Sequence, residues 1–134
     1  MRRINVKDWP ILSASATGNS AGINVSDYRN CVLSLVGSAS TASLKVFVMG
    51  GIGEASPDFT VNKGSRAAAS AWDFIECVDL EDGAAIDGDD GISIASNTVR
   101  LLEVNINALD WLAVRVTSVA AGTVTVKGTF ATNQ

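Results

Sequence analysis

The chain has 134 residues, a formal net charge of −4 and no histidine. Its length suits one domain with its own hydrophobic core. The acidic balance argues against nucleic acid as a partner, because phosphates call for a basic face. The lack of histidine removes the commonest general base. It also argues against a structural zinc site, since the two cysteines, Cys31 and Cys77, do not have CxxC spacing.

The N-terminus is the basic part of the chain. Residues 1–8 contain Arg2, Arg3 and Lys7, and we expect them to form an arm ahead of a single domain at 9–134. Arg2, Arg3, Lys7 and Trp9 are the candidate partner-binding residues. The start has no apolar run typical of a signal peptide. No stretch approaches the ~20 apolar residues of a membrane span, so we expect no membrane association.

Short runs of alternating apolar and polar residues recur along the whole chain, which is typical of strands in an all-β protein. We expect nine strands, at residues 9–16, 22–25, 31–36, 44–49, 72–80, 91–95, 99–107, 111–119 and 123–130. Strands this short and regularly spaced predict an antiparallel β-sandwich, of jelly-roll or immunoglobulin-like type, with eight to nine strands.

Two strand pairs have turn-forming residues between them and are predicted to be hairpins. The first joins 31–36 to 44–49, and the second joins 111–119 to 123–130 through Ala121 and Gly122. In the last strand, the alternation places one face in the core and the other in solvent. Its core face is formed by Val124, Val126 and Phe130.

Residues 50–65 contain four glycines and Pro57, which interrupt any continuous ladder, so this segment is predicted to be a mobile loop. The following stretch, 66–71, is rich in alanine but too short to form an independent helix. We expect a strand or loop there.

Eight of the fourteen carboxylates lie between Trp72 and Ile94, and no Lys or Arg occurs from Ala67 to Val99. Within this segment Asp87, Asp89 and Asp90 are weak calcium candidates, because closely spaced carboxylates supply the oxygen ligands of Ca²⁺. Their spacing does not match an EF-hand, and turn formation by Asp-Gly pairs is the favoured interpretation. We therefore predict no metal and no cofactor.

No G-x-S-x-G elbow or phosphate-binding G-x-x-x-x-G-K-[ST] loop is present. The sequence thus offers no catalytic residues, and we expect a protein that is not an enzyme. A small hydrolase using the clustered carboxylates is a minor alternative.

Several other side chains have two readings. Trp9, Trp72 and Trp111 favour packing over a sugar-binding platform. Arg115 and Lys45 are interpreted as solubilising charges, with pairing to a neighbour's carboxylate as the alternative. Cys31 and Cys77 are interpreted as buried thiols without a bridge. Only 18% of residues are charged, which indicates that neighbouring subunits cover part of the surface.

Five segments together resemble small β-sandwich proteins of tailed-bacteriophage virions. They are VSDYR at 25–29, WDFI at 72–75, VDLEDG at 78–83, IDGDDGI at 86–92 and VNINALDWL at 104–112. The resemblance implies a head-associated protein that decorates or cements the capsid exterior and is made in the host cytoplasm. Its implied partners are the major capsid protein and copies of itself, as a homotrimer or homodimer. A tail, fibre or carbohydrate-recognising receptor-binding module is the alternative.

Overall fold

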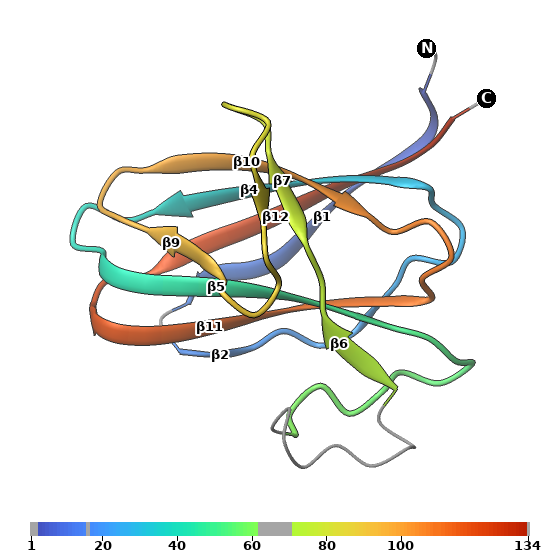
Figure 1. The fold of residues 1–134 in the computed structure, drawn as a ribbon, viewed down its shortest axis with the longest axis horizontal. Helices are drawn as coiled ribbons and strands as arrows, with labels where there is room; N and C mark the ends of the chain where they lie inside the picture. The colour runs from blue at the N-terminus through green and yellow to red at the C-terminus, as the bar shows by residue number, and fades with distance from the viewer. Residues whose placement is uncertain (1–2, 16, 62–70, 134) are drawn as a thin grey trace.

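The computed structural model describes residues 3–15, 17–61 and 71–133. In this part of the chain twelve strands form two facing antiparallel sheets, without a helix (Figure 1). The predicted all-β sandwich is confirmed, with more strands than the eight to nine expected. No helix of the described ranges is long and apolar enough to cross a membrane.

Sheet A has the strand order β1-β12-β4-β10-β7-β8. Its strands are β1 (Arg3–Ser15), β12 (Val124–Asn133), β4 (Asn30–Gly37), β10 (Val99–Asn105), β7 (Cys77–Asp79) and β8 (Ala85–Ile86). Sheet B has the order β2-β11-β5-β6, with β3 also paired to β11 and β9 to β5. Its strands are β2 (Gly18–Asn19), β11 (Trp111–Ala121), β5 (Ala42–Gly51), β6 (Trp72–Phe74), β3 (Ile23–Asn24) and β9 (Ile92–Ile94).

The additional strands have simple origins. The strand expected at 72–80 is divided, because the chain leaves sheet B after β6 and joins sheet A as β7. The strands β2 and β8 have two residues each, which is too short for an alternating pattern to show.

Both predicted hairpins are wrong. The strand β4 lies in sheet A and β5 in sheet B, while β11 lies in sheet B and β12 in sheet A. Each connection is therefore an arch between the sheets. The actual partners are β4 with β12 and β5 with β11, so the two arches stack side by side. Alternation fixes which side chains face inward, but it does not fix which strand is the neighbour.

Direct hydrogen bonds join the two arches. The Thr41 hydroxyl donates to the Thr123 carbonyl oxygen at 2.7 Å, and the Ser38 amide donates to the same oxygen at 3.0 Å. Gly122 has φ 97°, and a Cβ there would lie 2.1 Å from the Thr41 Cα. This glycine is thus required by the close approach of the arches as well as by its left-handed backbone.

The main core fills the space between the two sheets. Val124, Val126 and Phe130 are fully buried, as predicted, whereas the alternate residues of β12 face outward. Cys31 and Cys77 are buried and free, as expected. They pair with Val104 from opposite sides, so β10 lies between them.

The outer face of sheet B carries a second hydrophobic cluster, which the sequence did not predict. Met49, Phe59, Trp72 and Ala113 are buried there under the segment that follows β5. Met49 lies on the face of β5 opposite the core residues Val46 and Val48, and this face is covered. The predicted loop is confirmed for residues 52–61, which contain no strand, whereas Gly50 and Gly51 belong to β5. Phe59 is only 4% exposed, so part of this loop packs on sheet B. Residues 62–65, and the expected strand or loop at 66–70, lie outside the described residues.

The first described residues belong to an edge strand of sheet A. From Arg3, opposite Asn133, β1 runs antiparallel to β12 with register shifts along its length. Figure 1 shows the two chain ends running together beyond the body of the sandwich. The residues 3–8 expected in an arm are therefore the start of β1, while Met1 and Arg2 are not among the described residues.

Candidate functional site

The acidic segment forms turns at the edge of the sandwich. The Asp87 carboxylate accepts the amide of Asp89 at 2.9 Å, and the Asp87 carbonyl accepts the amide of Asp90 at 3.1 Å. Gly91 has φ 69°, as a turn glycine requires, whereas a Cβ at Gly88 would collide with the backbone of Phe74. These contacts match the turn interpretation of the Asp-Gly pairs.

The three calcium candidates do not converge on a cation site. Within residues 3–15, 17–61 and 71–133, no group of three or more His, Cys, Asp or Glu side chains is arranged to hold a metal ion. Asp87, Asp89 and Asp90 are exposed on one turn, and the Lys45 ammonium donates to the Asp90 carbonyl oxygen at 3.0 Å. The turn is thus held to the neighbouring strand β5 by a hydrogen bond from a lysine.

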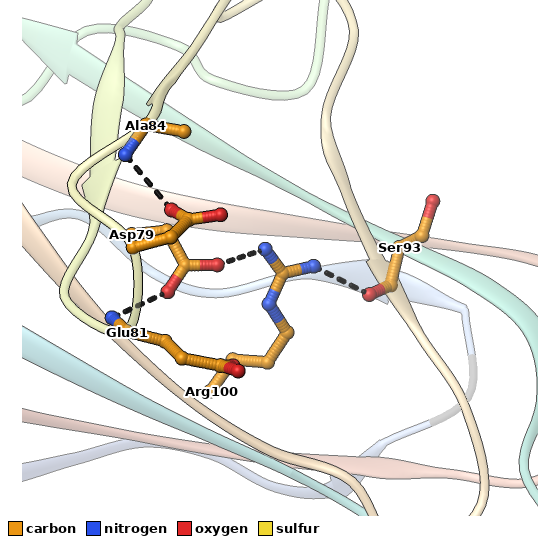
Figure 2. A network of polar contacts seen from close by, with 6 residues as sticks. Asp79, Glu81, Ala84, Ser93 and Arg100 are labelled. Carbon is orange, nitrogen blue, oxygen red and sulfur yellow. Dashed lines mark hydrogen bonds and ion pairs between the residues drawn. The ribbon is translucent and has the colours of Figure 1, made fainter.

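One carboxylate of the segment differs from the others because it is nearly buried. Asp79, at the end of β7, accepts the amide of Glu81 at 2.9 Å and binds the Arg100 guanidinium at 2.5 Å (Figure 2). Arg100 also donates to the carbonyl oxygen of Ser93 at 3.1 Å. Since Ser93 belongs to sheet B, Arg100 links the rims of the two sheets.

The same contacts set the ionisation of Asp79. The hydrogen bond from the Glu81 amide, and then the bond from Arg100, hold the pKa of this carboxyl below its ordinary value. Ion pairs also occur for purely structural reasons, and here the pair closes a turn and a sheet rim. We assign it a structural role.

The two buried thiols are expected to be unreactive. Burial raises the pKa of Cys31 and of Cys77 to about 12. A thiol in that state is protonated at neutral pH and is a poor nucleophile. Neither cysteine has the properties of a catalytic group.

Lys7 and Trp9, two of the partner-binding candidates, lie together on β1. The Lys7 ammonium is 5.5 Å from the centre of the Trp9 ring, and Trp9 packs edge-on against Phe130 with ring centres 6.3 Å apart. Lys7 is exposed and Trp9 is half-buried. Trp9 therefore anchors this end of β1, and Lys7 leaves a positive charge at the surface.

The three tryptophans do not form a joint platform, since each is engaged in packing. The Trp72 indole N–H donates to the Asp58 carbonyl oxygen at 3.0 Å, and the Trp111 indole N–H donates to the Gly53 carbonyl oxygen at 2.9 Å. Both fasten the segment 52–61 to sheet B. The packing interpretation is confirmed for these residues.

Arg115 was read as a solubilising charge, and this reading is wrong. Its guanidinium donates to the Asn19 side chain at 2.9 Å and to the Phe59 carbonyl oxygen at 2.5 Å, and its centre lies 5.4 Å from the Trp72 ring. Partial burial lowers the pKa of Arg115. The signal in the sequence was an arginine on the same face of its strand as Trp111 and Ala113.

The outer face of sheet A is different, because it exposes large hydrophobic side chains. Among the side chains the structure describes, five large hydrophobic ones are exposed, and four of them lie on this side of the molecule: Val36 (40%), Leu80 (46%), Val99 (61%) and Leu101 (46%). We call these four the A-face patch. The sequence analysis did not identify it.

The A-face patch is continuous across β4, β10 and Leu80, the residue that follows β7. Val99 pairs directly with Val36, and Leu101 lies two residues along the same face of β10. The amide of Leu80 donates to the carbonyl oxygen of Leu101 at 3.0 Å, and a shallow depression lies between Leu80, Val99 and Leu101. Contiguous exposed apolar residues of this kind mark interaction surfaces more often than isolated ones do.

Opposite charges border the patch on the same outer face. Lys127 on β12 is exposed and lies opposite Ser34, which in turn lies opposite Leu101. Glu103 on β10 is exposed and lies opposite Val32. The face thus has a positive strand on one side of β4 and a negative strand on the other.

Together these features define a two-sheet β-protein. The outer face of its sheet B is covered by residues 52–61, and the outer face of its sheet A is not covered by another part of the described chain. No family model matches the chain, and no curated protein matches it. Its fold is similar to that in the crystal structure of the SPBc2 prophage-derived protein YomS, with a TM-score of 0.69 and 16% sequence identity. The match covers 96% of this chain and 94% of the other chain. At this identity, the likeness shows a shared fold.

Proposed function

We propose that this chain is a non-enzymatic structural protein of a tailed-bacteriophage virion, which decorates the capsid exterior and stabilises the shell. Its partners are the major capsid protein and further copies of itself. The observation that carries the proposal is the likeness to a prophage-derived protein over nearly the full length of both chains. The resemblance of the turn and strand segments to virion β-sandwich proteins adds to it.

The surface of the molecule suits this role. A decoration protein gains its attachment energy from repeated contacts across a shell, so it needs adhesive faces on a stable scaffold. The bare outer face of sheet A and the exposed Lys7 on β1 supply an apolar and a basic contact. The clustered carboxylates are used in turns and in the link to Arg100, which fits a scaffold better than a hydrolase.

The basic end of β1 is proposed to face the shell. The sequence has three basic residues in its first seven positions, Arg2, Arg3 and Lys7, and Trp9 holds β1 through its contact with Phe130. Such a contact attracts an acidic capsid surface and weakens as salt rises. The tryptophans that motivated the carbohydrate-binding alternative are accounted for by packing.

Co-sedimentation with empty heads of the source phage, prepared without this protein, tests the proposal. The wild-type protein is expected to pellet with the heads, and the double variant R3E/K7E to lose most of this binding. The matched double variant R29E/K45E carries the same charge change at exposed sites elsewhere and should still bind. If the wild-type protein stays in the supernatant with heads but pellets with tails, it is a tail protein and the capsid role is wrong.

A further inference from the structure

The bare face of sheet A identifies a surface for self-association. We infer that the outer face of sheet A, centred on the A-face patch, binds the same face of a second copy of this chain. The inference deepens the self-association within the proposed function by naming its surface. The inference rests on the proposed function only for the premise that copies of the chain associate.

The first argument is the position of the exposed hydrophobic residues. Val36, Val99 and Leu101 project from the middle of a six-stranded sheet, where solvent-facing residues are ordinarily polar. The corresponding face of sheet B is covered by residues 52–61, which bury Phe59 and Trp72. Sheet A thus presents apolar surface of the kind that its counterpart keeps covered.

The second argument is that Lys127 and Glu103, which border the patch on opposite sides, carry opposite charges. In a two-fold dimer the same patch serves both partners, so each charge must meet the opposite charge of the other copy. A two-fold axis along β4, in the plane between the copies, places β12 of one copy over β10 of the other. Lys127 then lies over Leu101 of the second copy, two residues along the strand from its Glu103.

Side-chain chemistry fits this arrangement. The four methylene groups of Lys127 can cover Leu101 while the ammonium reaches the carboxylate of Glu103. Val36, on the axis strand, meets its own counterpart in the second copy, and Thr125 faces Val99. Each contact away from the axis occurs twice, which a partner of unrelated sequence would not provide.

Sedimentation equilibrium of the purified protein alone, across a range of concentrations, tests the inference. The wild-type protein is expected to form dimers. Leu101→Lys should weaken the dimer at least about tenfold in Kd, because it places a charge in the centre of the apolar contact. Ile52→Lys is the matched control, since Ile52 is 57% exposed but lies outside sheet A, and it should leave the Kd unchanged.

A charge exchange tests the orientation of the two copies. Lys127→Glu and Glu103→Lys should each weaken the dimer about tenfold, whereas the combined variant should recover to within a few-fold of wild type. Far-UV circular dichroism and urea unfolding confirm that each exposed substitution leaves the fold intact. Equal Kd values for Leu101→Lys and Ile52→Lys, or no recovery in the combined variant, would overturn the inference.

The remaining outcomes separate this inference from the proposed function. A wild-type monomer at every concentration overturns the self-association. If Leu101→Lys then abolishes binding to phage heads, the occupant of this face is the capsid and not a second copy. A dimer that depends on Leu101 but ignores both heads and tails supports the inference and removes the virion role.

Discussion

Adjacent residues of β12 face opposite sides of sheet A, one toward the interior of the sandwich and the next toward the outer face. Val126 is fully buried between the sheets, whereas its neighbour Thr125 points to the other side and is half-exposed. A one-residue change of position along the strand therefore moves a side chain from the core to solvent.

This difference predicts unequal effects for one substitution at adjacent positions. Val126→Asp should lower the free energy of unfolding by about 3–5 kcal/mol, because it buries a carboxylate without a partner. Thr125→Asp should cost less than about 1 kcal/mol. Urea unfolding at low protein concentration measures both values. Equal losses would mean that the assigned facing of β12 is wrong.

At the scale of elements, the segment 52–61 is fastened to sheet B by one arginine and two indole groups. Arg115 binds the carbonyl oxygen of Phe59 and stacks near Trp72. Lys45, on the neighbouring strand β5, is exposed and makes a single described contact, with the carbonyl oxygen of Asp90.

We therefore predict that Arg115→Ala destabilises the protein by about 1–3 kcal/mol, since it leaves the carbonyl of Phe59 without its charged donor. Lys45→Ala, the matched control, should change the free energy of unfolding by less than about 0.5 kcal/mol. Limited proteolysis is a second measurement. Cleavage within residues 52–61 should become faster in Arg115→Ala and should be unchanged in Lys45→Ala. Similar behaviour of the two variants would contradict the role of Arg115.

The rim contact between Asp79 and Arg100 predicts a dependence of stability on pH. The folded protein lowers the pKa of Asp79 below the ordinary value of 3.8, so its ionised form is favoured in the folded state. This contribution is fully present above that ordinary value and is lost as the pH falls through the lower folded pKa. Protonation of Asp79 thus contributes to acid unfolding.

Asp79→Asn should remove that part of the pH dependence. The variant is expected to be less stable than wild type at pH 7, and the difference should shrink at an acidic pH below the ordinary value of 3.8, as the wild-type carboxyl takes up its proton. Urea unfolding at both pH values measures the change. Asp82→Asn serves as control, because the exposed Asp82 accepts the Ala84 amide at 2.8 Å. A difference for Asp79→Asn that stays constant with pH would contradict the assignment.

The strands show which features of the fold could be predicted from the alternation of apolar and polar residues. Alternation correctly indicated most of the strands and the inward face of β12, because burial of Val124 and Val126 depends only on the pleat. It did not indicate that β12 pairs with β4 and β1, since pairing is decided by contacts distant in sequence. The close approach of Gly122 to Thr41 appears in the sequence only as a turn glycine.

The candidate sites were predictable to a smaller degree. The turn role of Asp87 follows from its Asp-Gly setting, which is local. The A-face patch brings together Leu80, Val99 and Val36 from three separate segments, so no single stretch of sequence displays it. Arg115 was misread for the same reason, because the segment that covers it comes from more than fifty residues earlier in the chain.

At the scale of the whole molecule, the two ends of the described chain lie in neighbouring strands. Arg3 pairs with Asn133, and β12 lies between β1 and β4 inside sheet A. The sandwich is therefore completed by pairing segments from opposite ends of the sequence. Folds dominated by such distant contacts form more slowly than folds built from local contacts.

The two outer faces of the molecule also differ in kind, since sheet B is covered by residues 52–61 and sheet A is bare. An adhesive surface that meets an unlike surface on the next copy can add subunits without limit and produce fibres. In the dimer that we infer, the segment 52–61 covers sheet B and the two outer faces of sheet A bind each other, so no adhesive surface would be left for a third copy. Such a dimer would end assembly at two copies, and we expect no polymers at high protein concentration.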